Sequence, residues 1–519
     1  MYSTVRSSLG KLLSAACVSL VALVSCAIGT PKTFAARNGT AVSANLNSII
    51  NADTMGMGVE WDPYDHYSPS PQDWNTIIQR LDFMDPSFVR DISGGNSTDT
   101  RILAWAQQHN SQVIFGAWTP SPLSSTSDPT TSAIDSWATT TAQYVAGLNA
   151  TYGNVIHYYN FINEPQNLSI STWSTMANAL QTAFSNAGLG NSVQVIGPDT
   201  YGDPSSGTVS SSTWPLLQSV ARAQAGGATA PGLFDIHWYP GSDSEVTDGS
   251  IETTLVKEKQ MVISADPAAA SKPFLVSEAG LNQGVNQYDQ QSAVTTFNYG
   301  VTMADYAVQV FNAGWNGISA WDLDDAMHVD NGQSATNPPG PDTLKEWGFW
   351  NSQGAAMGDP SAFNIRPWFY TWSLMSRLFA CGTTIISSSV PTNLSNFRML
   401  TGTRIVNGRS VISIELVNDG TSAQSILVKI PTMAAPTNLT QYSYFQNDMP
   451  VDASGFAVPS DMFTQVNLGQ GLQINMPADG VMFLTDAPVP EPASLSLLAL
   501  ASCGLLLLRS RRRPGTCQV

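Results

Sequence analysis

Two glutamates stand at the ends of short apolar segments, where a pair of carboxyl groups could provide acid–base and nucleophilic chemistry. Glu164 follows the segment 159–163, and Glu278 follows the segment 274–277, 114 residues further along the chain. Hydrolysis of a glycosidic bond with retention of configuration needs two carboxyl groups about 5–5.5 Å apart, one protonated and one ionised. The end of an apolar segment partly desolvates Glu164, which favours its protonated form. The two residues are therefore candidates for a catalytic pair.

Other glutamates could fill the same roles. Glu60 falls within an apolar segment, and Glu252 and Glu258 lie in a predicted helix, where we expect them to be solvated. Glu164 could instead cap the helix that is predicted to follow Pro165. The choice among these residues depends on the elements that position them.

Both candidate glutamates belong to a pattern that recurs from about residue 55 to 325. A β-rich segment is followed by a loop and an amphipathic stretch, and the eight segments are Gly56–Trp61, Ser87–Ile92, Gln112–Trp118, Ile156–Asn163, Val193–Pro198, Leu233–Tyr239, Pro273–Glu278 and Gly317–Trp321. Eight such units predict an α/β fold of the (β/α)8 or TIM-barrel type, whose active site lies at the C-terminal strand ends. An open, doubly wound sheet is the alternative, but the chain shows no glycine-rich phosphate loop.

The motif Asn163-Glu164-Pro165 on the fourth predicted strand resembles the Asn-Glu-Pro motif of glycoside hydrolase clan A, a group of retaining (β/α)8-barrel glycosidases. The resemblance covers residues 55–325 and implies that Glu164 is the acid/base and that Asn163 binds the sugar 2-hydroxyl. The nucleophile of the clan ends the seventh strand, as Glu278 does here. Ala279 stands where the commonest clan sequence has an aromatic residue, so families 39, 30 and 5 all remain open.

The resemblance also implies roles for residues around the nucleophile. Arg90 ends the second strand, where clan A has an arginine beside the nucleophile, and such a cation keeps a carboxylate ionised. Tyr239 and His237 end the sixth strand, where the clan often has a residue that hydrogen-bonds the nucleophile. A histidine at this position could equally be a core residue with satisfied hydrogen bonds.

Aromatic and acidic residues at the strand ends predict the rest of a sugar-binding cleft. Trp321 ends the eighth strand, where a clan A tryptophan often lines the subsite of the cleaved sugar, and Trp61 and Trp118 could stack on other sugars. An acidic cluster that could bind sugar hydroxyls or calcium consists of Asp322, Asp324, Asp325 and Asp330. Its spacing matches no standard calcium loop, so we expect a solvated loop, no metal site and no cofactor.

After residue 365 the pattern changes. One more helix is predicted at Pro367–Phe379, and the β-rich segments beyond it are Thr384–Ser388, Phe397–Thr401, Val411–Val417, Gln424–Ile430, Gln441–Phe445, Thr464–Leu468, Leu472–Met476 and Val481–Thr485. This spacing predicts an all-β sandwich, to which Ala41–Leu46 could add a strand. We therefore expect a catalytic barrel over residues 50–365 and a β-sandwich domain over residues 366–487.

The N-terminus predicts export. Arg6 and Lys11 precede an apolar run from Leu12 to Ile28, and small residues follow it, which is typical of a secretory signal peptide over residues 1–35. The segment 23–26 also resembles a bacterial lipobox, which would place a lipid on Cys26. The alternative is that Cys26 simply belongs to the apolar run.

The C-terminus predicts sorting. Over residues 489–513, Val489-Pro490-Glu491-Pro492 precedes the apolar run Ala493–Leu508 and the basic cluster Arg509–Arg513. The run is at the short end for crossing a bilayer, with the arginines on the cytoplasmic side. This order resembles the PEP-CTERM sorting signal of Gram-negative bacteria, which implies transient membrane association, processing by exosortase-type machinery and a final place at the cell surface or outside the cell. A tail anchor that stays in place is the alternative.

The composition suits an exported domain with an uncharged partner. Without the two ends, the chain keeps 15 Lys and Arg against 38 Asp and Glu, a formal net charge of −23. This charge argues against nucleic acid and anionic lipid as partners. Cys381 is the one cysteine left in this body, so no internal disulfide is expected there, and we expect it to be buried.

These observations predict an exported retaining glycoside hydrolase that acts on a polysaccharide or an oligosaccharide. A non-catalytic carbohydrate-binding or extracellular-matrix protein on the same barrel would explain the aromatic residues and the tail, but it would not need both glutamates. A transglycosylase differs only in how well its acceptor sites exclude water, so the sequence does not separate it from a hydrolase.

Overall fold

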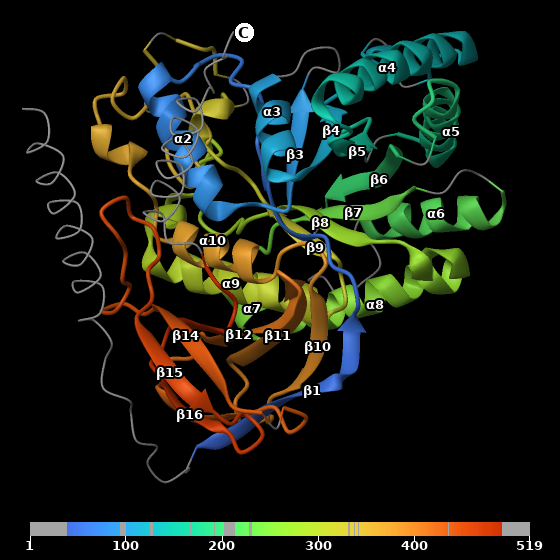
Figure 1. The fold of residues 1–519 in the computed structure, drawn as a ribbon. Helices are drawn as coiled ribbons and strands as arrows, with labels where there is room; N and C mark the ends of the chain where they lie inside the picture. Colours follow the sequence, from blue (N-terminus) through green and yellow to red (C-terminus); the bar gives the residue numbers. More distant parts are fainter. Residues whose placement is uncertain are drawn as a thin grey trace, which may run out of the picture.

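The computed structural model describes residues 39–489, apart from 94–99, 125–127, 166–167, 191, 202–212, 228–230, 331–332, 337, 341 and 434 (Figure 1). The predicted signal peptide and nearly all of the predicted sorting segment therefore lie outside the described residues. Within the described ranges, no helix is both long and apolar enough to cross a bilayer.

Eight parallel strands close into a barrel in sequence order, as predicted. They are β2 Gly56–Glu60, β3 Phe88–Ser93, β4 Gln112–Ala117, β5 Ile156–Asn160, β6 Gln194–Tyr201, β7 Leu233–Trp238, β8 Phe274–Ala279 and β9 Gly317–Ala320. Strands β2, β7, β8 and β9 are buried along their whole length, because barrel strands are covered on both faces and so read as continuous apolar runs.

Helices surround the barrel and confirm the amphipathic pattern (Figure 1). They are α2 Pro71–Met84, α3 Thr100–His109, α4 Thr131–Tyr152, α5 Ile170–Asn186, α6 Thr213–Ala225, α7 Asp243–Thr247, α8 Ser250–Ala265, α9 Phe297–Asn312 and α10 Trp368–Leu378. Several begin at a side-chain cap, since Ser70, Thr130 and Ser169 each accept a hydrogen bond from a first-turn N–H. These caps fix where the loops at the mouth of the barrel end and the helices begin.

The β-sandwich domain is built on a second sheet of nine described strands, in the order β15-β14-β17-β12-β11-β10-β1-β13-β16. They are β1 Thr40–Asn51, β10 Thr384–Ser389, β11 Phe397–Val406, β12 Arg409–Asn418, β13 Gln424–Lys429, β14 Thr437–Tyr444, β15 Asp461–Val466, β16 Leu472–Met476 and β17 Gly480–Thr485. The strand predicted near the N-terminus is β1, which pairs with β10 and β13. The sheet thus joins both ends of the described chain.

Side chains along a strand point alternately to the two faces of the sheet, so the two faces of the second sheet pack into different hydrophobic cores. Met399 and Leu416 point into a core that the domain forms on its own. Their neighbours Leu400 and Val417 belong to the core of the barrel. The sheet packs there against α9 and α10, and Figure 1 shows it below these helices.

This interface buries a carboxyl group without a partner. Glu415 on β12 is fully buried, and neither of its carboxyl oxygens has a hydrogen-bond partner among the described residues. Burial, together with the nearby charge of Asp305 on α9, raises the pKa of Glu415 well above its ordinary value of 4.5. The folded state therefore keeps a proton on Glu415 that the unfolded chain releases above pH 4.5.

We expect Glu415→Gln to flatten the pH dependence of stability. Because the pKa of Glu415 is raised on folding, its contribution to the free energy of unfolding falls as pH rises from 4.5 toward the raised value, by about 1.4 kcal/mol per pH unit. Glutamine has no proton to lose and removes this slope. Urea unfolding between pH 5 and pH 8 measures it, with the exposed Asp342→Asn as the matched control. If the free energy of unfolding depends on pH equally in the wild type and in Glu415→Gln, the pKa of Glu415 is not raised by folding.

Candidate active site

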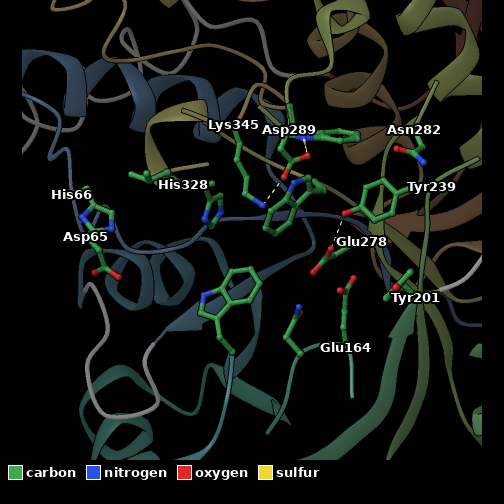
Figure 2. Close-up of a pocket in the computed structure, with 16 residues that line it drawn as sticks. Asp65, His66, Glu164, Tyr201, Tyr239, Glu278, Asn282, Asp289, His328 and Lys345 are labelled. Atoms are coloured by element: carbon green, nitrogen blue, oxygen red, sulfur yellow. Dashed lines mark hydrogen bonds and ion pairs between the residues drawn. The ribbon is translucent and has the colours of Figure 1, made fainter. Parts of the chain in front are cut away.

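The two predicted catalytic glutamates meet at the C-terminal end of the barrel (Figure 2). Glu278 is part of β8, and Glu164 follows β5. Glu164 has φ 48° and Asp199 has φ 56°, and the N–H of Glu164 donates to the carbonyl of Asp199 at 3.0 Å. Left-handed backbone at residues other than glycine costs energy and gathers at functional sites. The chain here accepts an unfavourable conformation that orients Glu164.

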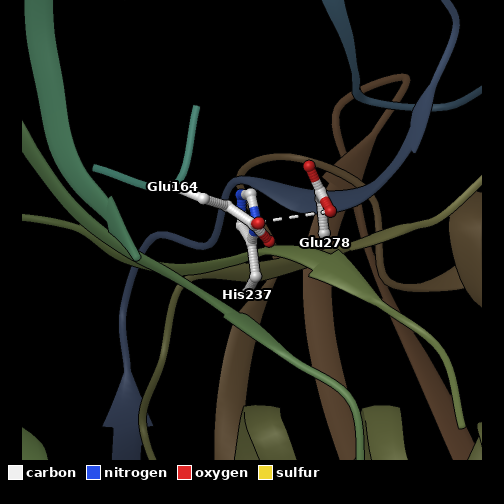
Figure 3. A group of neighbouring side chains, drawn as sticks. All are labelled: Glu164, His237 and Glu278. Atoms are coloured by element: carbon white, nitrogen blue, oxygen red, sulfur yellow. Dashed lines mark hydrogen bonds and ion pairs between the residues drawn. The ribbon is translucent and has the colours of Figure 1, made fainter. Parts of the chain in front are cut away.

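The environments of the two carboxyl groups differ. Glu278 is 4% exposed, and its two oxygens accept hydrogen bonds from Arg90 Nη1 at 2.5 Å and from the Tyr239 hydroxyl at 2.7 Å. The Glu164 side chain is 33% exposed, and its Oε1 lies 3.0 Å from His237 Nδ1. One ligand-type atom of each of Glu164, His237 and Glu278 lies within 4.8 Å of the other two (Figure 3). The carboxyl groups are thus close together, one fixed and one open to solvent.

Arg90 links the acidic residues below the cavity. It is fully buried and contacts Glu60 at 2.7 Å, Asp199 at 3.1 Å and Asn163 at 2.8 Å, besides Glu278. Burial raises the pKa of Glu60 to about 8. Burial also acts to raise the pKa of Asp199, but the charges of Arg90 and His237 hold it below its ordinary value. Arg90 lies beside the nucleophile candidate, as the resemblance implied, and it does not reach the cavity.

His237 lies between two carboxylates. Its Nδ1 faces Glu164, and its Nε2 lies 3.0 Å from Asp199 Oδ1. Burial alone would lower the pKa of this imidazole, but the carboxylates of Glu278 and Asp199 hold it well above its ordinary value. An imidazolium donates from both ring nitrogens, which matches both contacts. His237 is fully buried, so it orients Glu164 rather than contacting a sugar.

The atoms of Glu164, His237 and Glu278 are close enough to hold a metal ion, but their surroundings do not favour one. Both nitrogens of His237 already face carboxylates. Arg90 contacts Glu278 at 2.5 Å, and a second cation there would be repelled. The donor set suits two carboxyl groups held by hydrogen bonds better than a metal centre.

A cavity of about 750 Å³ opens above the two glutamates. Besides Glu164 and Glu278, its lining includes four residues that the sequence predicted, namely Trp118, Asn163, Tyr239 and Trp321. Trp321 is only 5% exposed, because His328 stacks on its ring with the centroids 4.7 Å apart. Trp118 is 37% exposed and Tyr201 is 50% exposed. These last two rings offer the larger faces for stacking on a sugar.

Four predicted binding residues do not line the cavity, namely Arg90 and His237, which are buried below it, and Trp61 and Asp322. Trp61 is fully buried, and its ring packs against Trp74 on α2 and Trp105 on α3. Alternation along the strand explains this position, because Glu60 points into the barrel and the next side chain points out toward the helices. Asp322 is also fully buried, and burial and the charges of the neighbouring aspartates raise its pKa well above its ordinary value.

The prediction of a solvated acidic loop after the eighth strand is wrong. Asp324 and Asp325 are buried and paired. Asp325 forms an ion pair with Arg366 at 2.5 Å, and Asp324 accepts a hydrogen bond from the N–H of Ser352 at 2.9 Å. The cluster therefore holds the segment after β9 in place. Two other expectations also fail, since Glu258 is buried and Cys381 is exposed.

Several residues at the cavity were not predicted as site residues. Asp199 lies near the end of β6 and is buried below the cavity, and its place near the end of a strand is the signal that could have singled it out. Tyr201, Asp289, His328 and Lys345 also line the cavity or its wall. Apart from Tyr201, these lining residues come from long loops without periodicity, where a sequence gives no register.

Comparison with solved structures finds the same fold in glycoside hydrolases. The GH30 endoxylanase from Clostridium papyrosolvens C71 matches with a TM-score of 0.55 and 12% identity, over 86% of this chain and 99% of that chain. A glucosidase from Croceicoccus marinus matches with a TM-score of 0.57 and 12% identity, over 86% of this chain and 98% of that chain. The alpha-L-arabinofuranosidase from Thermotoga maritima matches with a TM-score of 0.53 and 11% identity, over 86% of this chain and 99% of that chain. No family model and no curated protein sequence matches the chain.

Proposed function

We propose that this protein is a retaining glycoside hydrolase with Glu278 as nucleophile and Glu164 as acid/base. The observation that carries the proposal is the close approach of the two carboxyl groups, since one oxygen of Glu164 lies within 4.8 Å of one oxygen of Glu278. Retaining enzymes hold their carboxyl groups about 5–5.5 Å apart, whereas inverting enzymes need about 6.5–9.5 Å to admit a water molecule.

The contacts of each carboxyl group support its role. A nucleophile must be ionised and fixed below the anomeric carbon, and Glu278 is buried and accepts from the Arg90 guanidinium and the Tyr239 hydroxyl. An acid/base must exchange protons with the leaving group and with water, and Glu164 is the more exposed of the two. His237 holds Glu164 toward the nucleophile.

In the first step Glu278 attacks the anomeric carbon while Glu164 gives its proton to the leaving oxygen, and a covalent glycosyl-enzyme forms. In the second step Glu164 takes a proton from water, and the water attacks the same carbon and releases Glu278. Asn163, held by Arg90 at 2.8 Å, would hydrogen-bond the sugar 2-hydroxyl. Trp118 and Tyr201 would stack on sugar rings of the bound substrate.

The structural neighbours support a carbohydrate substrate, because their names describe a xylanase, a glucosidase and an arabinofuranosidase. Their identity to this chain is low, so the sugar and linkage do not follow from them. A transglycosylase would use the same two steps with a sugar acceptor in place of water. We also propose that the protein is exported by the signal peptide and sorted through the PEP-CTERM segment, which would place the barrel at the cell surface or outside the cell.

Reducing-sugar release by residues 36–487 from a panel of plant and algal polysaccharides tests this function. We expect release from at least one glycan, and proton NMR of the first product should show the anomeric configuration of the substrate. A product of inverted configuration would overturn the retaining mechanism. Binding to a glycan without any release would favour a non-catalytic carbohydrate-binding protein instead.

A further inference from the structure

Asp289 and Lys345 form an ion pair in the wall of the cavity, apart from the catalytic carboxyl groups. Lys345 Nζ lies 2.6 Å from Asp289 Oδ2, and the two side chains are 15% and 31% exposed. The ammonium also lies over the ring of Trp321, 5.8 Å from its centroid. Figure 2 shows the two side chains pointing toward one another on the same side of the cavity. Both groups line the space that a sugar would fill.

Hydrogen bonds between loops fix the position of this pair. The N–H of Lys345 donates to the carbonyl of His328 at 3.1 Å, and the N–H of Glu346 donates to the carbonyl of Asp289 at 3.3 Å. Asp289 has φ 54°, a left-handed conformation that aspartate tolerates but that still costs energy. A solvent-exposed ion pair would need no such support, so the pair is a built part of the cavity wall.

Trp347 connects the pair to the nucleophile. Its Nε1–H donates to Asp289 Oδ1 at 3.0 Å. Its ring packs edge-on against Tyr239, with the centroids 5.4 Å apart, and the hydroxyl of Tyr239 donates to Glu278 at 2.7 Å. The pair therefore flanks the sugar whose anomeric carbon would face Glu278.

The charges around the pair decide which sugar it suits. Asp289 neutralises Lys345, which is the one lysine or arginine among the described residues that line the cavity, while Asp65, Glu164 and Glu278 add carboxyl groups. A uronic acid carboxylate would find no unpaired cation there. An ammonium with spare N–H donors beside a carboxylate acceptor instead matches two neighbouring hydroxyls, one accepting and one donating.

We propose that Asp289 and Lys345 together bind two adjacent hydroxyls of the sugar that faces Glu278, and thereby select neutral sugars over uronic acids. This inference rests on the proposed function and narrows its substrate class. It assigns the selection to two loop residues that do not take part in bond cleavage.

Thio-linked disaccharides test the inference, because sulfur in place of the glycosidic oxygen lets them bind without being cleaved. Matched pairs differ only in carrying glucose or glucuronic acid, or galactose or galacturonic acid, as the non-reducing sugar. By calorimetry we expect the full chain to bind the neutral member about tenfold or more tightly than the uronic member, the size of effect that one charged contact gives. Lys345→Met should weaken binding of the neutral member by about tenfold.

Asp289→Asn is the sharper variant. The amide oxygen can still accept from Trp347, but Lys345 becomes an unpaired cation, so the preference should shift toward the uronic member by about tenfold. Asp65→Asn removes the same charge from the same cavity without freeing a cation, and it should leave the preference almost unchanged. Circular dichroism checks that each variant is folded.

A wild type that prefers the uronic member, or an Asp289→Asn variant with an unchanged preference, would overturn the inference. If glycan release is observed and the preference is absent, the inference fails alone. If neither release nor binding of any of these sugars is observed, the proposed function fails with it.

Discussion

Glu278→Gly will lower the rate of glycoside cleavage by about 10⁴-fold or more, the scale of loss expected when a covalent nucleophile is removed. The residue is buried below the cavity and held by Arg90 and Tyr239, so no other described carboxyl group can take its place. Glu60, one of the rivals in the sequence, is fully buried, contacts the same Nη1 atom of Arg90 and does not line the cavity. The measurement is the initial rate on whichever glycan the wild type cleaves, with a dinitrophenyl glycoside of the same sugar beside it.

Added azide distinguishes loss of the nucleophile from loss of the fold. The missing side chain leaves space for a small anion, and azide that attacks from that space displaces the leaving group in one step. We therefore expect azide to restore turnover of the dinitrophenyl glycoside and to yield a glycosyl azide of inverted configuration. The conservative Glu278→Gln fills the same space and should show no rescue. A Glu278→Gly variant that keeps more than about a tenth of wild-type activity would remove the assignment of the nucleophile.

The barrel and the meeting of Glu164 and Glu278 at one end of it could be predicted from the sequence, because both depend on local patterns. The strand and helix periodicities are set by neighbours a few residues apart, and strand order alone brings Glu164 and Glu278 to the same end of the barrel. The failure at Trp61 shows where this reasoning stops. Which face of a strand a residue occupies depends on register, and a shift of one residue exchanges the inside and the outside.

Long-range pairing explains the other failures. Asp325 was expected to be solvated, but it is paired with Arg366, 41 residues further on, and nothing in the local sequence marks that partner. The same holds for Asp289 and Lys345, which only the loop-to-loop hydrogen bonds bring together. Loop residues acquire their roles from the fold. The loop residues in the wall of the cavity therefore could not be predicted, whereas the residues at the strand ends could.

Glu164→Ala should separate the two chemical steps, because a general acid matters most when the leaving group is poor. For a natural glycan, whose leaving alcohol needs a proton, we expect a loss of about 10²–10⁴-fold, the range that general acid catalysis contributes. For a dinitrophenyl glycoside, whose leaving group needs no proton, formation of the glycosyl-enzyme should be almost unaffected. The second step then becomes slow, so a rapid burst of dinitrophenol should precede a slow steady state.

Added azide also tests the role of Glu164, but the product expected from Glu164→Ala has the opposite configuration to the product expected from Glu278→Gly. Without Glu164, azide can attack the glycosyl-enzyme from the side that water would use, and two displacements give a glycosyl azide of retained configuration. Retention with Glu164→Ala and inversion with Glu278→Gly would together place the two carboxyl groups on opposite faces of the sugar. An equal loss of activity on the natural glycan and on the dinitrophenyl glycoside, without a burst, would instead mean that Glu164 supports the site and does not transfer the proton.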